Sequence, residues 1–211
     1  MPACETRLAL ITDRLVCPEP LLDRVARLLA AGVGTVILRE KDLPEPELLT
    51  LAGKIQKIAS LTGARLIVNS SLTVAAAVNA YGLQLPFAAF NANPQLIALA
   101  RAKNLLTSVS VHSLPEAALA IKAGADGLLA GPIFPTDCKP GREPLNLTFV
   151  AELVAVFKKP VFVVGGLGPD NVALARQAGA AGVALRSGLL TAPDPEQYVH
   201  KCLLAINNPF K

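Results

Sequence analysis

Short apolar runs alternate along this chain with longer stretches in which apolar and polar residues mix. Runs that are apolar throughout are typical of parallel strands buried on both faces, whereas strands with one exposed face alternate apolar and polar residues. This pattern predicts strands at residues 8–12, 35–39, 65–69, 82–85, 105–111, 127–130, 161–164 and 182–185.

The stretches between these runs have the periodicity of amphipathic helices, as at residues 21–31, 46–61, 114–123 and 171–178. Several close with a small-residue turn, in which Gly32, Gly124 or Gly179 can adopt the left-handed conformation that ends a helix. Eight strand–helix alternations without a linker predict an α/β fold, a single (β/α)8 TIM barrel in which residues 1–211 form one domain. A doubly wound sheet is the competing architecture, but it would have to use eight strands in a small chain.

Composition narrows the class of protein. Of the 211 residues, 52% are hydrophobic and none is tryptophan, so Val, Ile, Leu and Ala build the core. No apolar run approaches the ~18 residues of a membrane span, and the N-terminus has no signal-peptide pattern, so we expect a cytoplasmic protein without membrane contact. The net charge of +4 comes from scattered basic residues with few aromatic neighbours, which disfavours nucleic-acid binding and suits a small anionic ligand. Cys4, Cys17, Cys138 and Cys202 lack metal-ligand spacing and are expected to be free thiols.

The ends of the last three predicted strands carry turns suited to phosphate. In barrels, the loops after strands seven and eight are the usual place for a phosphate site. Here these loops contain Gly165-Gly166 and Arg186-Ser187, whose backbone N–H groups and side chains can bind an anion.

A long loop follows the sixth predicted strand. Loops of this length in a compact chain are usually functional. It contains Thr136, Cys138 and Lys139, and we expect Lys139 to bind phosphate. The alternative is that Lys139 is an ordinary solvated charge.

Basic residues interrupt the second predicted strand at its end. Alternate residues of a strand share a face, so Arg39 and Lys41 point the same way as Ile37, toward the barrel mouth. An unpaired cation in an apolar interior is very unfavourable, which predicts an anion-binding role. The alternative is a salt bridge from Arg39 to Glu40, to Asp42 or to a neighbouring loop.

Polar residues also end the third and fifth predicted strands. Asn69 could hydrogen-bond a ligand, or Asn69 or Ser70 could cap the next helix. Ser110 and His112 share a strand face near the mouth, and the ordinary pKa of histidine makes His112 a candidate acid or base. The alternative for His112 is a hydrogen-bonded structural role. Ser113 begins a capping box with proline in the first helical turn.

Four segments, in order along the chain, resemble the thiamine phosphate synthase/TenI superfamily. They are Leu38-Arg39-Glu40-Lys41, Ser110-Val111-His112-Ser113, residues 131–139 and Gly165-Gly166. The resemblance covers nearly the whole chain at compatible spacing. It implies one of two activities. Synthases join a pyrimidine diphosphate to a thiazole phosphate and need magnesium, whereas active TenI members are metal-independent thiazole tautomerases.

Positions that differ between the two branches favour TenI. Synthases follow the third strand with Asn-Asp, whose carboxylate helps to hold magnesium, where this chain has Asn69-Ser70. They carry a second metal carboxylate after the fourth strand, where residues 83–90 contain no acid. They also usually carry glutamine in place of Ile37 and threonine in place of Cys138. Two lost carboxylates remove the oxygen ligands that Mg²⁺ prefers, so the resemblance implies that no metal is bound.

Two positions depart from the TenI pattern. The tautomerase has a histidine, proposed as the proton shuttle, after the glycine that ends the sixth strand, where this chain has the synthase-like Pro132. His112 or Cys138 would then have to take and return the proton. Arg186 replaces a usually apolar residue and would bind phosphate through a bidentate contact.

We therefore predict a TenI-like enzyme of thiamine biosynthesis, a metal-independent thiazole tautomerase without a cofactor. One alternative is a thiamine phosphate synthase with a degenerate magnesium site, the only case in which Mg²⁺ is expected. The other is a non-catalytic regulatory protein that binds thiazole phosphate. Barrels of this kind often pair through their helices, which allows a homodimer. The candidate catalytic residues are His112 and Cys138, and the residues expected to bind the substrate are Arg39, Lys41, Asn69, Ser110, Thr136, Lys139, Gly165, Gly166, Arg186 and Ser187.

Overall fold

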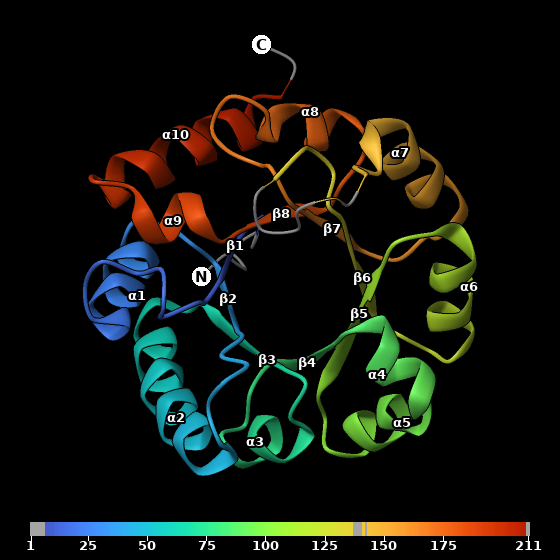
Figure 1. Cartoon of the computed structure of the whole chain (residues 1–211), viewed down its shortest axis with the longest axis horizontal. Helices are drawn as coiled ribbons and strands as arrows, with labels where there is room; N and C mark the ends of the chain where they lie inside the picture. Colours follow the sequence, from blue (N-terminus) through green and yellow to red (C-terminus); the bar gives the residue numbers. More distant parts are fainter. Residues whose placement is uncertain (1–6, 137–140, 142, 210–211) are drawn as a thin grey trace.

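In the computed structural model, which describes residues 7–136, 141 and 143–209, eight parallel strands close into a barrel (Figure 1). Each strand pairs with the next one along the chain, and β8 pairs with β1. The predicted (β/α)8 barrel is therefore confirmed. The strands are β1 (Leu8–Ile11), β2 (Thr35–Leu38), β3 (Arg65–Asn69), β4 (Gly82–Leu85), β5 (Leu106–Val111), β6 (Gly127–Ala130), β7 (Val161–Val164) and β8 (Gly182–Leu185).

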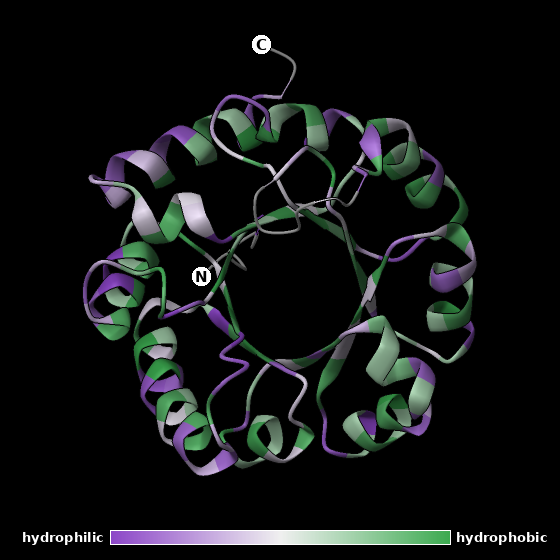
Figure 2. Ribbon diagram, in the orientation of Figure 1, coloured by the Kyte–Doolittle hydropathy of each residue, from purple (hydrophilic) through white to green (hydrophobic). Residues whose placement is uncertain are grey.

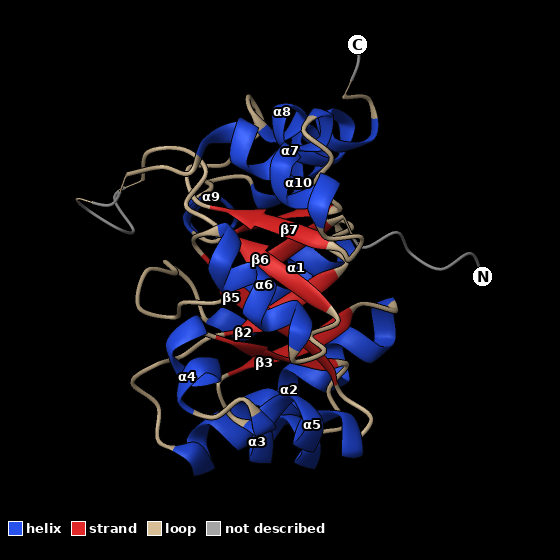
Figure 3. Cartoon of the chain, turned by 90° about the vertical axis from the view of Figure 1, so that its right-hand side faces the viewer, coloured by secondary structure: helices blue, strands red, loops and turns tan. Residues whose placement is uncertain are grey.

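Helices surround the barrel in a ring (Figures 1 and 3). In the described ranges, none of them is long and apolar enough to cross a membrane. They are α1 (Leu21–Ala30), α2 (Glu45–Thr62), α3 (Leu72–Ala77), α4 (Phe87–Ala92), α5 (Gln95–Ala102), α6 (Leu114–Lys122), α7 (Asn146–Val156), α8 (Val172–Gln177), α9 (Ser187–Thr191) and α10 (Pro195–Asn207).

Side chains set the start of several helices. The Ser113 hydroxyl accepts a hydrogen bond from the Glu116 N–H at 3.3 Å, so the predicted cap of α6 is confirmed. The predicted cap of the third helix at Asn69 or Ser70 is wrong, because Ser71 accepts from the Val74 N–H at 3.2 Å. Ser70 instead has a left-handed φ of 68° and donates its hydroxyl to the Asn69 side chain.

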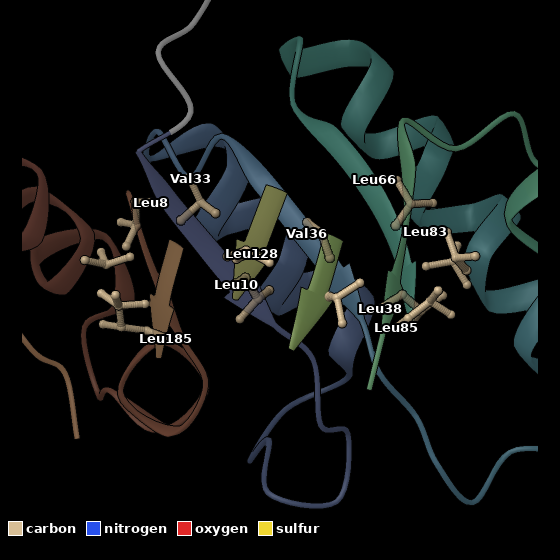
Figure 4. Close-up of a cluster of buried hydrophobic side chains, with 14 of the residues drawn as sticks. Leu8, Leu10, Val33, Val36, Leu38, Leu66, Leu83, Leu85, Leu128 and Leu185 are labelled. Carbon is tan, nitrogen blue, oxygen red and sulfur yellow. The ribbon is translucent and has the colours of Figure 1, made fainter. Parts of the chain in front are cut away.

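The strands alternate between two apolar environments. On β1, Leu8 and Leu10 point outward and pack under the helices (Figure 4), whereas Ala9 and Ile11 point into the barrel. The ribbon coloured by hydropathy shows the same arrangement for the helices, whose apolar faces lie against the strands (Figure 2). Burial on both faces explains why most strand residues are apolar. A polar residue on the inner face is therefore an exception that needs a local reason.

Candidate functional site

A cavity of about 610 Å³ opens at the carboxyl ends of the strands. It collects most of the predicted site residues from six strands and the loops that follow them. Cys138 and Lys139 lie outside the described residues. The predicted residues that line the cavity are Arg39, Lys41, Asn69, Ser110, His112, Thr136, Gly165, Gly166, Arg186 and Ser187.

The floor of this cavity is apolar. Ile11, Ile37 and Leu129 line it from the barrel interior, and Ala184 leaves room beside them because its side chain is a single methyl group. Apolar walls with a few convergent polar groups are typical of sites for small organic ligands. The cavity can therefore hold an aromatic ring below its polar rim.

Gly165 and Gly166 form the turn that ends β7. Gly165 has a φ of 99°, and a Cβ placed on it would lie 2.5 Å from the Pro132 Cβ. The Gly165 carbonyl accepts from the Phe134 N–H at 3.1 Å, and the Gly166 carbonyl accepts from the Asn171 side chain at 2.8 Å. Glycine is thus required here by close packing against the loop after β6, and the turn also lines the cavity.

Arg186 follows β8 and crosses toward the loop after β1. Its Nη1 donates to the Asp13 Oδ2 at 2.8 Å. The following helix, α9, has only five residues. Tyr198 of α10 packs against its first turn, since a Cβ on Gly188 would lie 2.1 Å from the Tyr198 hydroxyl, and burial raises the pKa of Tyr198 to about 12. The loop that carries Arg186 and Ser187 is therefore held from two sides.

Arg39 and Lys41 line the cavity from the loop after β2. The Arg39 N–H donates to the Thr12 hydroxyl at 2.9 Å. Glu40 and Asp42, the acids considered as partners for Arg39, bind Arg14 at 3.2 and 2.7 Å. The hydrogen bond from Arg14 lowers the pKa of Asp42 below its ordinary value.

Amide and hydroxyl side chains connect β3, β4 and β5 at the cavity wall. The Asn69 amide donates to the Gln84 Oε1, and the Gln84 Nε2 donates to the Ser110 hydroxyl oxygen at 2.6 Å. Gln84 is buried, with 3% of its surface exposed. Gln84 is a site residue that was not predicted, although a polar residue in an apolar strand is the same signal that drew attention to Arg39.

His112 has defined hydrogen bonds at the end of β5. Its backbone N–H donates to the Glu116 Oε2 at 2.6 Å, and its Nδ1 lies 2.6 Å from the Gly131 carbonyl oxygen. A carbonyl only accepts, so Nδ1 carries a proton, and in the neutral ring Nε2 is an acceptor. The ring lines the cavity. The structural role considered for His112 is thus present, together with a position suited to ligand contact.

The charges around this cavity suit anions better than cations. Arg39, Lys41 and Arg186 line it, and Glu116 is the one carboxylate among its described lining residues. Glu116 already accepts the His112 N–H. Within the described residues, no group of three or more His, Cys, Asp or Glu side chains could hold a metal ion. The donor set is therefore a poor fit for Mg²⁺, which prefers carboxylate oxygens.

Comparisons with known proteins identify relatives over nearly the full length. A family model described as thiamine monophosphate synthase matches residues 8–189. A relative from Geobacter sulfurreducens is 38% identical, covering 99% of this chain and 98% of the relative. The thiamine-phosphate synthase of Pyrococcus horikoshii is 35% identical, covering 89% of this chain and 88% of its own. The solved thiamine phosphate pyrophosphorylase from Pyrococcus furiosus superposes with a TM-score of 0.83 at 28% identity, and 99% of each chain is covered.

These relatives overturn the tautomerase prediction. Proteins that are 33–35% identical to this chain over about nine-tenths of its length are named as synthases, and the similar solved structure is a pyrophosphorylase. The tautomerase prediction depended on a few positions at which synthases carry metal-binding acids, whereas the similarity to synthases extends over the whole barrel. The predicted thiazole tautomerase is therefore wrong, and the synthase alternative is the better supported one. The broader predictions of a thiamine-biosynthesis family and an enzyme are confirmed.

Proposed function

We propose that this chain, which belongs to the thiamine monophosphate synthase/TenI family, is a transferase that joins a thiazole phosphate to a pyrimidine diphosphate. The observation that carries this proposal is a single cavity with two basic regions. Arg39 and Lys41 belong to the β2 side, and Arg186 belongs to the β8 side, with β1 between them around the ring. A reaction between two anionic substrates requires two such regions facing one space.

The turn after β7 and the loop after β8 are suited to the phosphate of the thiazole. Gly165 and Gly166 offer backbone groups, and Arg186 and Ser187 offer side-chain donors just after β8, the next strand. A guanidinium matches a phosphate with two parallel hydrogen bonds. Thr136 lines the same cavity from the loop after β6 and is a further donor.

The region after β2 is suited to the diphosphate. In the coupling, the thiazole forms a bond to the carbon that carries the diphosphate, the carbon–oxygen bond breaks, and pyrophosphate leaves with the electron pair. Negative charge thus grows on the leaving oxygens, where Arg39 and Lys41 can stabilise it. The apolar floor at Ile37 and Leu129 limits the access of water to the reacting carbon.

A coupled assay with both substrates tests this proposal. The purified protein should form thiamine phosphate and pyrophosphate in equal amounts. Charge-assisted hydrogen bonds contribute ~1.5–3 kcal/mol, so Arg186→Leu should raise the KM for the thiazole phosphate by about 10–100-fold. Arg39→Gln should instead raise the KM for the pyrimidine diphosphate. Lys57→Gln, on the exposed face of α2 and outside the cavity lining, is the matched control and should leave both constants unchanged. Absence of product while both substrates bind would contradict the proposed reaction.

A further inference from the structure

The wall formed by β3, β4 and β5 lacks the acids that magnesium-dependent synthases carry after their third and fourth strands. At this wall, the side chains of Asn69, Gln84 and Ser110 form a hydrogen-bonded network across the three strands. All three line the cavity. This wall of the cavity therefore consists of neutral side chains that are hydrogen-bonded to one another.

Most polar atoms of Asn69, Gln84 and Ser110 are hydrogen-bonded to one another or to neighbouring groups. The Asn69 Nδ2 donates to both Gln84 oxygens, Oε1 and the backbone carbonyl, and the Asn69 Oδ1 accepts the Ser70 hydroxyl at 3.0 Å. The Gln84 Nε2 donates to the Leu85 carbonyl at 3.1 Å and to Ser110 at 2.6 Å. Because the Ser110 oxygen accepts from Gln84, its own O–H is directed elsewhere and can donate to a group in the cavity.

A divalent cation at this wall would have to displace these hydrogen bonds and would gain only neutral ligands. It would also lie in a cavity whose described side chains include Arg39, Lys41 and Arg186, which repel it, and a single acid, Glu116, whose Oε2 accepts the His112 N–H. An anionic group meets the opposite conditions: basic side chains and the Ser110 hydroxyl as a donor.

We infer that this chain binds the diphosphate group directly through protein donors, without a divalent cation, and that Gln84 is the positioning residue that orients Ser110 as one of those donors. The identity of the ligand as an organic diphosphate rests on the proposed function. The negative charge of the diphosphate would be balanced by Arg39 and Lys41, the basic residues that line the cavity after β2.

Calorimetric titration with inorganic pyrophosphate, in EDTA and in excess magnesium chloride, tests the first part. The dissociation constant in EDTA should be equal to or lower than the one in magnesium, because magnesium competes for free pyrophosphate. Affinity that is about tenfold or more weaker in EDTA, or no binding in EDTA, would overturn the inference.

Substitutions at the wall test the positioning role. Gln84→Leu and Ser110→Ala should each weaken pyrophosphate binding in EDTA by about tenfold, the size expected for one hydrogen bond to a charged group. The double variant should lose no more than either single one, since both changes remove the same donor. Additive losses would show that Gln84 does not act through Ser110. Far-ultraviolet circular dichroism confirms folding, and Lys57→Gln again serves as the matched control.

A gain of metal dependence gives an independent check. Ser70→Asp restores the Asn-Asp pair that follows the third strand of magnesium-dependent synthases, adding a carboxylate beside the wall and keeping the Asn69 side chain. In this variant magnesium should strengthen pyrophosphate binding, and the lack of any magnesium effect would count against the inference. The two proposals fail separately. Magnesium-free binding without product formation contradicts only the reaction, whereas product formation with magnesium-dependent binding contradicts only the inference.

Discussion

Replacing Gly165 with alanine would test how the loops after β6 and β7 pack together at the cavity wall. Gly165 has a φ of 99°, and a Cβ there would lie 2.5 Å from the Pro132 Cβ and 2.7 Å from its Cα. These atoms belong to a backbone and a rigid ring, so no side-chain rotation can relieve the contact. Gly63, at the end of α2, offers a control, because its φ is 73° and no atom lies within 4 Å of its missing Cβ.

The two glycines separate two costs. A left-handed backbone costs a residue with a Cβ ~1–2 kcal/mol, and this is the whole loss in the free energy of unfolding that we expect for Gly63→Ala. Forcing extra atoms into a packed site costs a further ~1–3 kcal/mol. We therefore expect Gly165→Ala to lower the free energy of unfolding by about 2–5 kcal/mol.

Urea unfolding followed by circular dichroism measures both losses. With a slope of about 1–3 kcal/mol per molar urea, the excess loss in Gly165→Ala should be resolved as a lower midpoint than in Gly63→Ala. Because the strained turn lines the cavity, Gly165→Ala should also weaken binding of the thiazole phosphate, while Gly63→Ala leaves it unchanged. Equal losses in the two variants, with ligand binding intact, would refute the argument that close packing requires glycine at this position.

Two further predictions concern ionisable groups away from the cavity. Asp42 has its pKa lowered by Arg14 from an ordinary value of 3.8, so the stability that Asp42→Asn removes at neutral pH should disappear as pH falls through this lowered value. Urea midpoints at several pH values check this, and a difference that persists in strong acid would contradict it. Cys202 is fully buried, and burial raises its pKa to about 12, so iodoacetamide at mildly alkaline pH should leave it unmodified until urea is added. Peptide mass spectrometry identifies the modified cysteines, and rapid labelling of Cys202 in the folded protein would be the opposite result.

The barrel was predictable because burial on both faces leaves a simple pattern. Five of the eight strands have the predicted bounds, and β1, β2 and β5 differ by one residue at one end. The ends differ because hydrogen bonding, which hydropathy does not report, decides where a strand stops. At the end of β2, the Arg39 N–H donates to a side chain, the Thr12 hydroxyl, and the strand ends at Leu38.

The site was predictable only where a residue breaks a local pattern. Arg39 and Lys41 were predicted because they follow an apolar strand and share the face of Ile37, which alternate strand residues do. Both line the cavity. Asp13 was missed because its role depends on a partner 173 residues away. Gln84 does break an apolar strand, but its contact with Ser110, 26 residues away, could not be read from that local signal. The predicted reaction failed for a related reason. This chain lacks acids at the positions where synthases bind magnesium, and that absence led to the prediction of a different reaction. The sequence as a whole, however, is similar to synthases.

The loop after β1 connects the two basic regions without itself providing their charges. Two consecutive residues of this loop, Asp13 and Arg14, bind residues that follow different strands. Asp13 binds Arg186 after β8, and Arg14 binds Glu40 and Asp42 after β2. Glu40 lies between Arg39 and Lys41 in the sequence. Its contact with Arg14 therefore helps to fix the backbone that carries these two basic residues. The spacing between the two basic regions is therefore set by side chains absent from the described cavity lining. Substitutions at Asp13 or Arg14 should alter the affinity for the proposed substrates without removing a residue that lines the cavity.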